Sequence, residues 1–152
     1  MKKVWIGLAA LAAFLVPLVG AAPSAQAAAD GSITNCSRYD GSLCLYYLMN
    51  AGGSHVGLVG TVYNYDQNPA QCGSSGCAPY YFQSDGGGQG QHVKNDAEFA
   101  YNYSGNVYRV YYNSGFGGPA DELDPLGYGT YFRNLNQTYN NNASQQYMCG
   151  EC

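Results

Sequence analysis

The residues of this chain best suited to chemistry are its six cysteines. In an exported domain, an even number of cysteines predicts disulfides rather than metal or redox sites. Proximity in the sequence favours the pairs Cys36–Cys44 and Cys72–Cys77. Cys149 and Cys152 either pair with each other or each reach elsewhere, so the full connectivity stays open. A redox role for this last pair is disfavoured because no helix follows it.

Groups that could act as a catalytic base or nucleophile are few. His55 and His92 are the two histidines, and neither lies in an HExxH or nucleophile-elbow pattern. Asp66 and Asp85 could act as a carboxylate pair on a glycan, but nothing in their spacing singles them out. No glycine-rich phosphate loop is followed by a helix. We therefore predict that the protein is not an enzyme and requires no cofactor.

The first 27 residues have the pattern of a secretory signal peptide. Met1-Lys2-Lys3 is a short basic start, residues 4–20 are nearly all apolar, and Ala25-Gln26-Ala27 fits a small-residue cleavage site. Removal of residues 1–27 leaves one domain over residues 28–152, which is an ordinary size for a single domain. We expect an extracellular protein that makes no membrane contact after cleavage.

The charge of the mature chain narrows the choice of partner. Without Lys2 and Lys3, four basic residues stand against ten acidic ones, a net charge of −6. Nucleic acids and anionic membranes attract proteins through clustered Lys and Arg, so neither is an expected partner. Solubility must depend largely on Asn, Gln, Ser and Gly. The chain is expected to be a monomer.

An internal repeat organises the domain. Residues 44–53 (CLYYLMNAGG) and 109–118 (RVYYNSGFGG) align at two tyrosines and two glycines, which indicates one supersecondary unit used twice. No window shows helical periodicity. Strands are instead expected at residues 43–48, 56–65, 80–83, 99–103, 106–112, 129–135 and 145–149. Short strands with regular turn signals are typical of an all-β sandwich or barrel.

The first repeat is followed by about twenty more residues than the second, which is more than an ordinary connection needs. The excess fits at about residues 64–85, a segment that contains Pro69, Pro79 and the Cys72/Cys77 pair. Long loops are usually functional or disordered, and one closed by a short disulfide loses less entropy when it binds a partner. The insert is therefore a candidate functional surface, and the alternative is a stapled hairpin tip without a role.

The repeat resembles the Greek-key signature of the βγ-crystallins. Tyr111-x4-Phe116-x-Gly118 has the two aromatics and the glycine of that signature, whereas residues 46–53 have Ala51 at the middle position. With the signal peptide and the paired cysteines, the chain looks like the secreted bacterial branch that includes the Streptomyces metalloproteinase inhibitor family. The resemblance implies an all-β, βγ-crystallin-like sandwich of two Greek-key motifs, stapled by disulfides.

What this family implies about function is inhibition of a secreted protease, of the metalloproteinase type, by a rigid loop beside a short disulfide. The matching inhibitory-loop residues are Cys72, Gly73, Ser74, Ser75, Gly76 and Cys77, with Tyr80 and Tyr81 as larger anchors just outside. No large apolar side chain lies between the two cysteines to fill the pocket of a thermolysin-like enzyme. The two stretches remain alternatives for the contact surface.

The resemblance also implies calcium, held by side-chain and main-chain oxygens. Residues 140–144 resemble the Asn/Asp-rich element that ends a motif, with Asn140, Asn141 and Ser144 as ligands. The counterpart with Asn95 and Asp96 has Phe99 where Ser or Thr is expected, which predicts a weak site. The alternative is that these side chains only close turns by local hydrogen bonds.

Two further functions stay open beside inhibition. The first is a calcium-binding structural or envelope-associated protein without inhibitory activity. The second is a small secreted toxin or glycan-binding module, whose contact surface would be exposed tyrosines, since the chain contains 16 of them.

Overall fold

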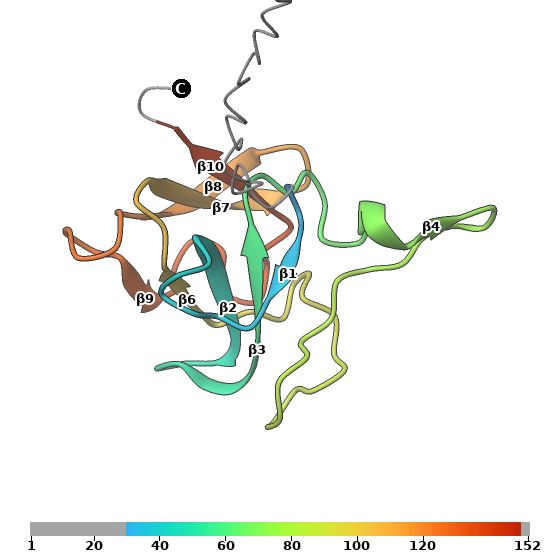
Figure 1. Ribbon diagram of the computed structural model, residues 1–152, viewed down its shortest axis with the longest axis horizontal. Helices are drawn as coiled ribbons and strands as arrows, with labels where there is room; N and C mark the ends of the chain where they lie inside the picture. The colour runs from blue at the N-terminus through green and yellow to red at the C-terminus, as the bar shows by residue number, and fades with distance from the viewer. Residues whose placement is uncertain (1–29, 150–152) are drawn as a thin grey trace, which may run out of the picture.

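The backbone of the computed structural model, which describes residues 30–149, is arranged in β-strands with a single short 3-10 turn and no α-helix in that range (Figure 1). One sheet contains β1 (Ile33–Thr34), β2 (Ser42–Leu48), β3 (Gly52–Val59), β6 (Phe99–Asn102) and β9 (Phe132–Asn134), in the order β1-β3-β2-β6-β9. The second contains β7 (Val107–Asn113), β8 (Gly117–Leu123) and β10 (Ser144–Met148), in the order β10-β7-β8. A two-stranded ribbon, β4 (Cys72–Gly73) and β5 (Gly76–Cys77), follows the 3-10 turn Pro69–Gln71.

The two hairpins β2–β3 and β7–β8 are structural copies of each other. Tyr46 pairs with His55 and Leu48 with Gly52, with an irregularity between the two pairs. In the second hairpin Tyr111 pairs with Ala120 and Asn113 with Gly117, again with an irregularity between them. The equivalent turn glycines of the two copies, Gly53 and Gly118, have φ of 69° and 78°, in the left-handed region that favours glycine. The repeat read in the sequence is therefore one hairpin geometry used twice.

Each half of the chain also contributes a strand to the sheet of the other half. The segment 62–65 lies beside β10, where Val62 bridges Gln145 and the amide of Tyr65 donates to the carbonyl of Ala143 at 3.0 Å. From the second half, β9 pairs with β6, and the amide of Leu135 donates to the carbonyl of Glu98 at 2.9 Å. This exchange closes two interlocked Greek keys. The predicted all-β, disulfide-stapled sandwich of two Greek-key motifs is confirmed.

The core lies between the two sheets. Alternate residues of β2 and β3 (Leu43, Leu45, Val56 and Leu58) point inward and meet Tyr108, Val110 and Leu123 from β7 and β8. All of these side chains are at most 1% exposed. Because side chains alternate between the two faces of a strand, each strand turns one apolar face toward this shared core. Burial of that apolar surface stabilises the folded state by about 25 cal/mol per Å².

Both disulfides favoured by proximity are present. Cys36 bonds to Cys44 at the buried start of β2, and Cys72 bonds to Cys77 across the ribbon. Disulfides of this kind indicate folding in an oxidising environment. Cys152, and with it a Cys149–Cys152 pair, lies outside the described residues, as does the signal peptide at residues 1–27. No helix within residues 30–149 is long and apolar enough to cross a membrane.

The expected strand boundaries need three corrections. The segment 56–65 is not one strand, because β3 ends at Val59 and the chain turns at Gly60, with φ of 69°, before Val62 joins the other sheet. Residues 80–83 form an isolated bridge between Tyr81 and His92 and separate main-chain hydrogen bonds in place of a strand. Strand β8, with the sequence GGPADEL, and the two-residue strands β1, β4 and β5 were not among the expected strands.

Candidate functional site

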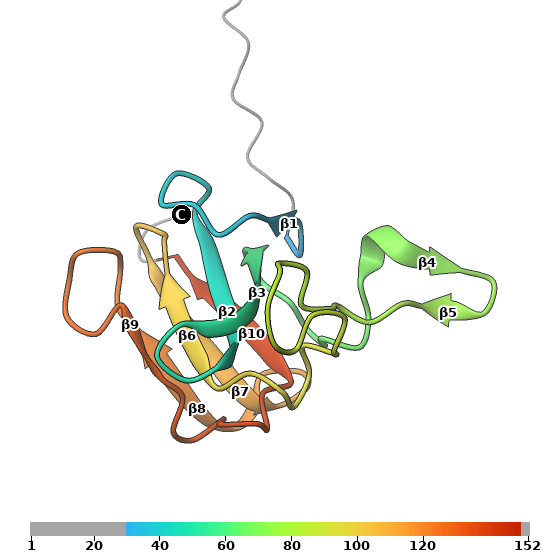
Figure 2. The same cartoon turned by 90° about the horizontal axis from the view of Figure 1, so that it is seen from below.

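A narrow hairpin projects from the body of the domain. In both ribbon views the green arm that carries β4 and β5 extends away from the two sheets, on the side opposite β9 (Figures 1 and 2). Main-chain hydrogen bonds run along it: the Tyr80 amide donates to the Tyr65 carbonyl, the Asn68 amide to the Ala78 carbonyl, and the Ala78 amide to the Gln71 carbonyl, at 2.8 to 3.0 Å. Farther out, Cys72 pairs with Cys77 and Gly73 with Gly76. We call residues 68–78 the projecting hairpin.

The base of the projecting hairpin is anchored in the core. Tyr65 and Tyr80 are both fully buried, and the Tyr80 hydroxyl donates to the Gly31 carbonyl at 3.1 Å. Burial raises the pKa of the Tyr65 hydroxyl well above its usual range. Outside the core, Lys94 and Asp66 form an ion pair of 2.7 Å beside the base. These contacts fix the direction in which the arm leaves the domain.

Asn68 is the residue of the base that sequence reasoning missed. Its side chain is 2% exposed and accepts a hydrogen bond from the Ala70 amide at 3.0 Å, which caps the short turn Pro69–Gln71. An Asn-Pro pair is a turn-initiating signal, so Asn68-Pro69 could have been recognised in the sequence. The cap therefore fixes the base of the projecting hairpin, and the disulfide joins its two strands next to the tip.

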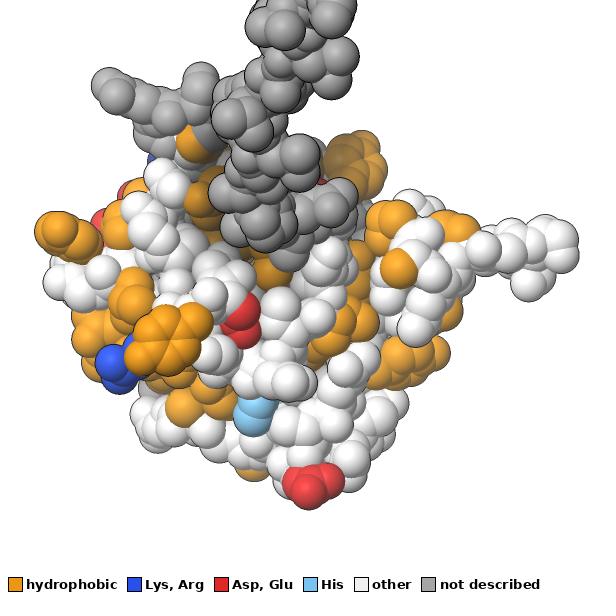
Figure 3. All heavy atoms as spheres, in the orientation of Figure 1, with side chains coloured by type: hydrophobic (Ala, Val, Ile, Leu, Met, Phe, Trp, Pro, Cys, Tyr) orange, Lys and Arg blue, Asp and Glu red, His pale blue; other side chains and the backbone are white. Residues whose placement is uncertain are grey.

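The tip of the projecting hairpin is exposed and uncharged. Residues 71–76 are all exposed, and no charged or aromatic residue occurs between Gln67 and Pro79. In Figure 3 the outer part of the arm carries neither red nor blue spheres. Gly76 has φ of 111°, a conformation that strains any other residue, so glycine is required for this turn. The tip is a preformed, disulfide-closed turn presented to solvent.

A groove of about 370 Å³ lies between the projecting hairpin and the body. Pro69, Cys72 and Cys77 form its hairpin wall, while Val62 and Tyr63 form its body wall. Tyr63 is 65% exposed and its ring meets Phe116 edge-on at 5.5 Å. The surface beside the hairpin is therefore apolar and concave, in contrast to the polar tip.

The two larger residues considered as anchors lie apart from the tip. The Tyr80 side chain is inside the core and cannot reach a partner surface. Tyr81 is half-buried, bridges His92 and packs its ring against the His92 imidazole at 5.0 Å. Of the expected inhibitory-loop residues, the structure brings Cys72, Gly73, Ser74, Ser75, Gly76 and Cys77 together on one exposed turn and separates Tyr80 and Tyr81 from it.

The two Asn-rich elements occupy equivalent positions and contact each other. Asn95 and Asn140 both have positive φ, 66° and 49°. The Asn95 amide donates to the Asn142 carbonyl at 2.8 Å, and the Asn140 amide donates to the Ala97 carbonyl at 3.0 Å. The elements therefore meet across the pseudo-two-fold axis of the repeat, a relation that their spacing in the sequence does not reveal.

Three of the expected calcium ligands, Asn140, Asn141 and Ser144, make side-chain hydrogen bonds within the protein. The Ser144 hydroxyl donates to the Asn113 carbonyl at 2.7 Å and accepts from the Phe116 amide at 3.2 Å. The side-chain amide of Asn140 donates to the Glu98 carboxylate at 3.3 Å. The side-chain amide of Asn141 donates to the Tyr139 carbonyl at 2.9 Å. Within the described part of the chain, no three His, Cys, Asp or Glu side chains gather to hold a metal ion. The Ser144 oxygen is thus engaged in two hydrogen bonds, whereas Asn140 and Asn141 are held through their side-chain nitrogens.

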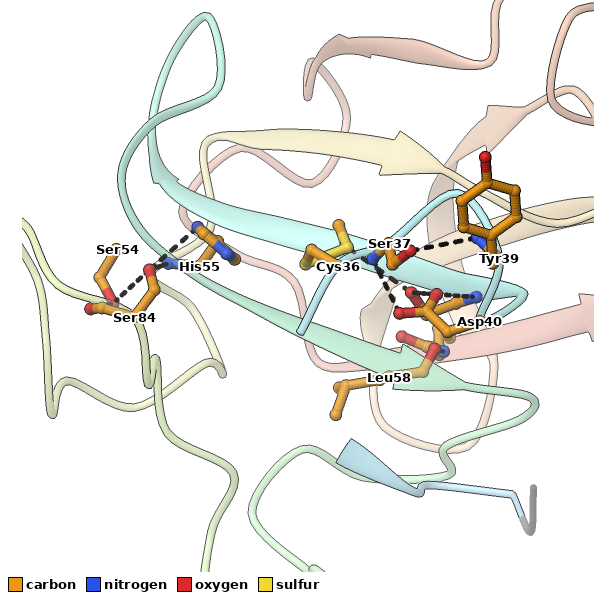
Figure 4. Close-up of a disulfide and its surroundings, with 11 residues drawn as sticks. Cys36, Ser37, Tyr39, Asp40, Ser54, His55, Leu58 and Ser84 are labelled. Carbon is orange, nitrogen blue, oxygen red and sulfur yellow. Dashed lines mark hydrogen bonds between the residues drawn. A yellow bond between two sulfur atoms is a disulfide. The ribbon is translucent and has the colours of Figure 1, made fainter. Parts of the chain in front are cut away.

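His55 fastens the long insert to strand β3. The Ser84 hydroxyl lies 2.9 Å from Nδ1 of His55 and accepts from the His55 amide at 2.8 Å (Figure 4). The Ser54 hydroxyl donates to the Ser84 carbonyl at 2.5 Å. Burial lowers the pKa of His55 below its usual value. The histidine thus joins two segments that are 29 residues apart in the chain.

Comparisons with known proteins add one likeness. No protein-family model matches the chain, and no curated protein matches it. A solved structure described as "Evolution of the eye lens beta-gamma-crystallin domain fold" is similar, with a TM-score of 0.47 and 14% sequence identity, over 73% of this chain and 88% of that chain. The strand exchange and the paired hairpins define the fold independently of this likeness. The protein is a disulfide-stapled domain of two interlocked Greek keys that presents one projecting hairpin.

Proposed function

We propose that this protein is a secreted peptidase inhibitor that acts through the projecting hairpin. The observation that carries the proposal is the hairpin itself, a preformed and exposed arm that is closed by a disulfide and anchored in the core. Such an arm can enter the cleft of an enzyme without losing much conformational entropy, and this favours tight binding.

The chemistry of the arm also fits resistance to cleavage. A main chain held by a hydrogen-bonded ladder and a disulfide cannot easily adopt the extended, separated conformation that peptide hydrolysis requires. A peptidase that binds the arm is therefore blocked rather than supplied with a substrate. The oxidising environment indicated by the disulfides agrees with the extracellular setting in which secreted peptidases act.

The test is inhibition of a panel of secreted peptidases by the oxidised domain, residues 28–152. The panel contains serine and metallopeptidases of different side-chain preference. The Cys72→Ser/Cys77→Ser variant loosens the arm, and Tyr128→Ala is the matched control. Its loop, between β8 and β9, lies on the side away from the hairpin (Figure 2).

We expect inhibition of at least one peptidase, retained in Tyr128→Ala and weakened by at least about tenfold in the double variant, which corresponds to about 1.4 kcal/mol. If the folded, uncleaved domain inhibits no peptidase of the panel, the proposal is wrong and the family resemblance describes the fold alone.

A further inference from the structure

The side chains of the projecting hairpin restrict the kind of enzyme that it can block. Between Gln67 and Pro79 the chain offers only Gln, Asn, Pro, Ala, Cys, Gly and Ser side chains. None can place a positive charge in an acidic specificity pocket, and none can fill a deep apolar pocket. An empty or unpaired pocket costs affinity, because its buried groups lose their partners.

The ribbon is also unusually thin near its tip. Gly73 and Gly76 face each other across the two strands. A Cβ atom built on either glycine would meet nothing within 4 Å, so the face of the ribbon on which these two positions lie is bare backbone. Glycine inside a strand marks a place where another backbone can approach closely. The peptide groups of the tip are thus accessible for main-chain hydrogen bonds with an enzyme cleft.

The projecting hairpin also lacks charged residues, which limits the contacts by which it can recognise an enzyme. The mature domain carries a net charge of −6, yet its projecting hairpin carries none. Recognition by the arm therefore cannot depend on ion pairs, and must depend on shape and on main-chain hydrogen bonds. The Ser74 and Ser75 side chains at the turn add only small volumes.

We infer that the target is a peptidase with narrow subsites for small side chains such as Gly, Ala and Ser. This inference rests on the proposed inhibitory function and adds the specificity class of the enzyme. A peptidase with a deep acidic pocket, or with a large apolar pocket like that of thermolysin, would gain nothing from this tip. The small pocket excludes bulkier inhibitors and admits the glycine-flanked turn.

The test compares enzymes that differ mainly in their pocket. Three serine peptidases of one fold form the set: one with a small pocket, one with a hydrophobic slot and one with an acidic pocket. Thermolysin is added as a metallopeptidase with a large pocket. Inhibition constants are measured for the oxidised wild-type domain, for Ser74→Leu and Ser75→Leu, and for the exposed control Gln137→Leu.

We expect the small-pocket enzyme to be inhibited at least about 100-fold more strongly than the others, and each tip leucine to weaken that inhibition at least about tenfold. Gln137→Leu should leave it unchanged. Because Ser74 and Ser75 are both exposed, the leucine variants are expected to fold, and circular dichroism verifies this.

Two results separate the inference from the proposed function. If the strongest inhibition falls on an enzyme with an acidic or large apolar pocket, or if tip leucines leave small-pocket inhibition unchanged, the specificity inference is wrong while inhibition stands. If no enzyme of any class is inhibited, the proposed function itself fails.

Discussion

Asp121 illustrates how a single residue departs from the symmetry of the repeat. Asp121 pairs with Val110 in the second hairpin, as Val56 pairs with Leu45 in the first. Asp121 therefore occupies the position that corresponds to Val56. Val56 belongs to the apolar core, whereas the Asp121 carboxylate is buried and accepts hydrogen bonds from the amides of Asn136 and Thr138 at 3.0 and 2.9 Å. The carboxylate organises the loop that follows β9.

Replacing this carboxylate should destabilise the domain strongly. Asp121→Ala leaves the Asn136 amide and the buried amide and hydroxyl of Thr138 without their acceptor, and we expect a loss of about 3 kcal/mol in the free energy of unfolding, measured by urea denaturation. The control is the adjacent, exposed Glu122, whose ion pair with Arg109 contributes about 0–1 kcal/mol. Equal effects of Asp121→Ala and Glu122→Ala would contradict this assignment.

His55 makes the stability of the domain depend on pH. Burial lowers its pKa in the folded state below the ordinary value of 6.5, so at mildly acidic pH the unfolded chain binds more protons than the folded one. Stability should therefore be complete above pH 6.5 and decrease as the pH falls through that value. We expect His55→Asn to reduce this slope in thermal unfolding between pH 7.5 and 5.5. The exposed His92→Asn is the control, and an equal reduction there would refute the role of His55.

At the scale of elements, the two described disulfides differ in what they hold. Cys44 is fully buried at the start of β2, whereas Cys72 is exposed on the arm. Loss of Cys36–Cys44 in a double serine variant should cost about 2–3 kcal/mol of global stability. Loss of Cys72–Cys77 should cost less, because the freed tip also gains entropy in the folded state.

The measurement for this comparison is denaturant unfolding together with limited proteolysis. The Cys72→Ser/Cys77→Ser variant should unfold at nearly the wild-type denaturant concentration but be cut faster within residues 71–78. A large drop in global stability would show instead that the arm supports the core.

The Asn-rich elements carry a prediction about calcium. Their side chains close turns through contacts already made, among them the two hydrogen bonds of Ser144. We therefore expect millimolar calcium to leave the melting temperature unchanged to within about 1 °C, and Ser144→Ala to lower stability equally with and without calcium. A calcium-dependent rise in melting temperature that Ser144→Ala or Asn140→Ala abolishes would establish a binding site.

At the scale of the whole molecule, the exchange of strands makes the two halves interdependent. The second-half sheet needs the segment 62–65, and the first-half sheet needs β9. The core contains residues of both halves. The two halves should therefore unfold together, in one cooperative transition.

Two fragments test this interdependence. Residues 30–103 and 104–149, produced separately, should each lack dispersed amide resonances and a cooperative transition. The first fragment contains both described disulfide pairs, so its failure to fold cannot be attributed to missing cysteines. A folded, cooperatively melting fragment of either kind would contradict the prediction.

Local features were readable from the amino-acid sequence because they depend on neighbours in the chain. The glycines at positions 53 and 118 match backbone turns with positive φ, and the two short disulfides follow from separations of eight and five residues. The short runs rich in apolar and aromatic residues at 43–48 and 106–112 likewise predicted β2 and β7 to within one residue. In each case the physical cause lies within a few residues.

The tertiary structure alone decided the features that depend on distant partners. Strand β8 is polar and contains a proline, so it forms because β7 lies beside it rather than by its own propensity. Tyr80 could have been a surface anchor, and only the packing of Tyr65 and Val93 around it determines that it belongs to the core. The projecting hairpin is exposed for the same reason: its sequence predicts a stapled turn, while the contacts at its base determine that the turn stands away from the body.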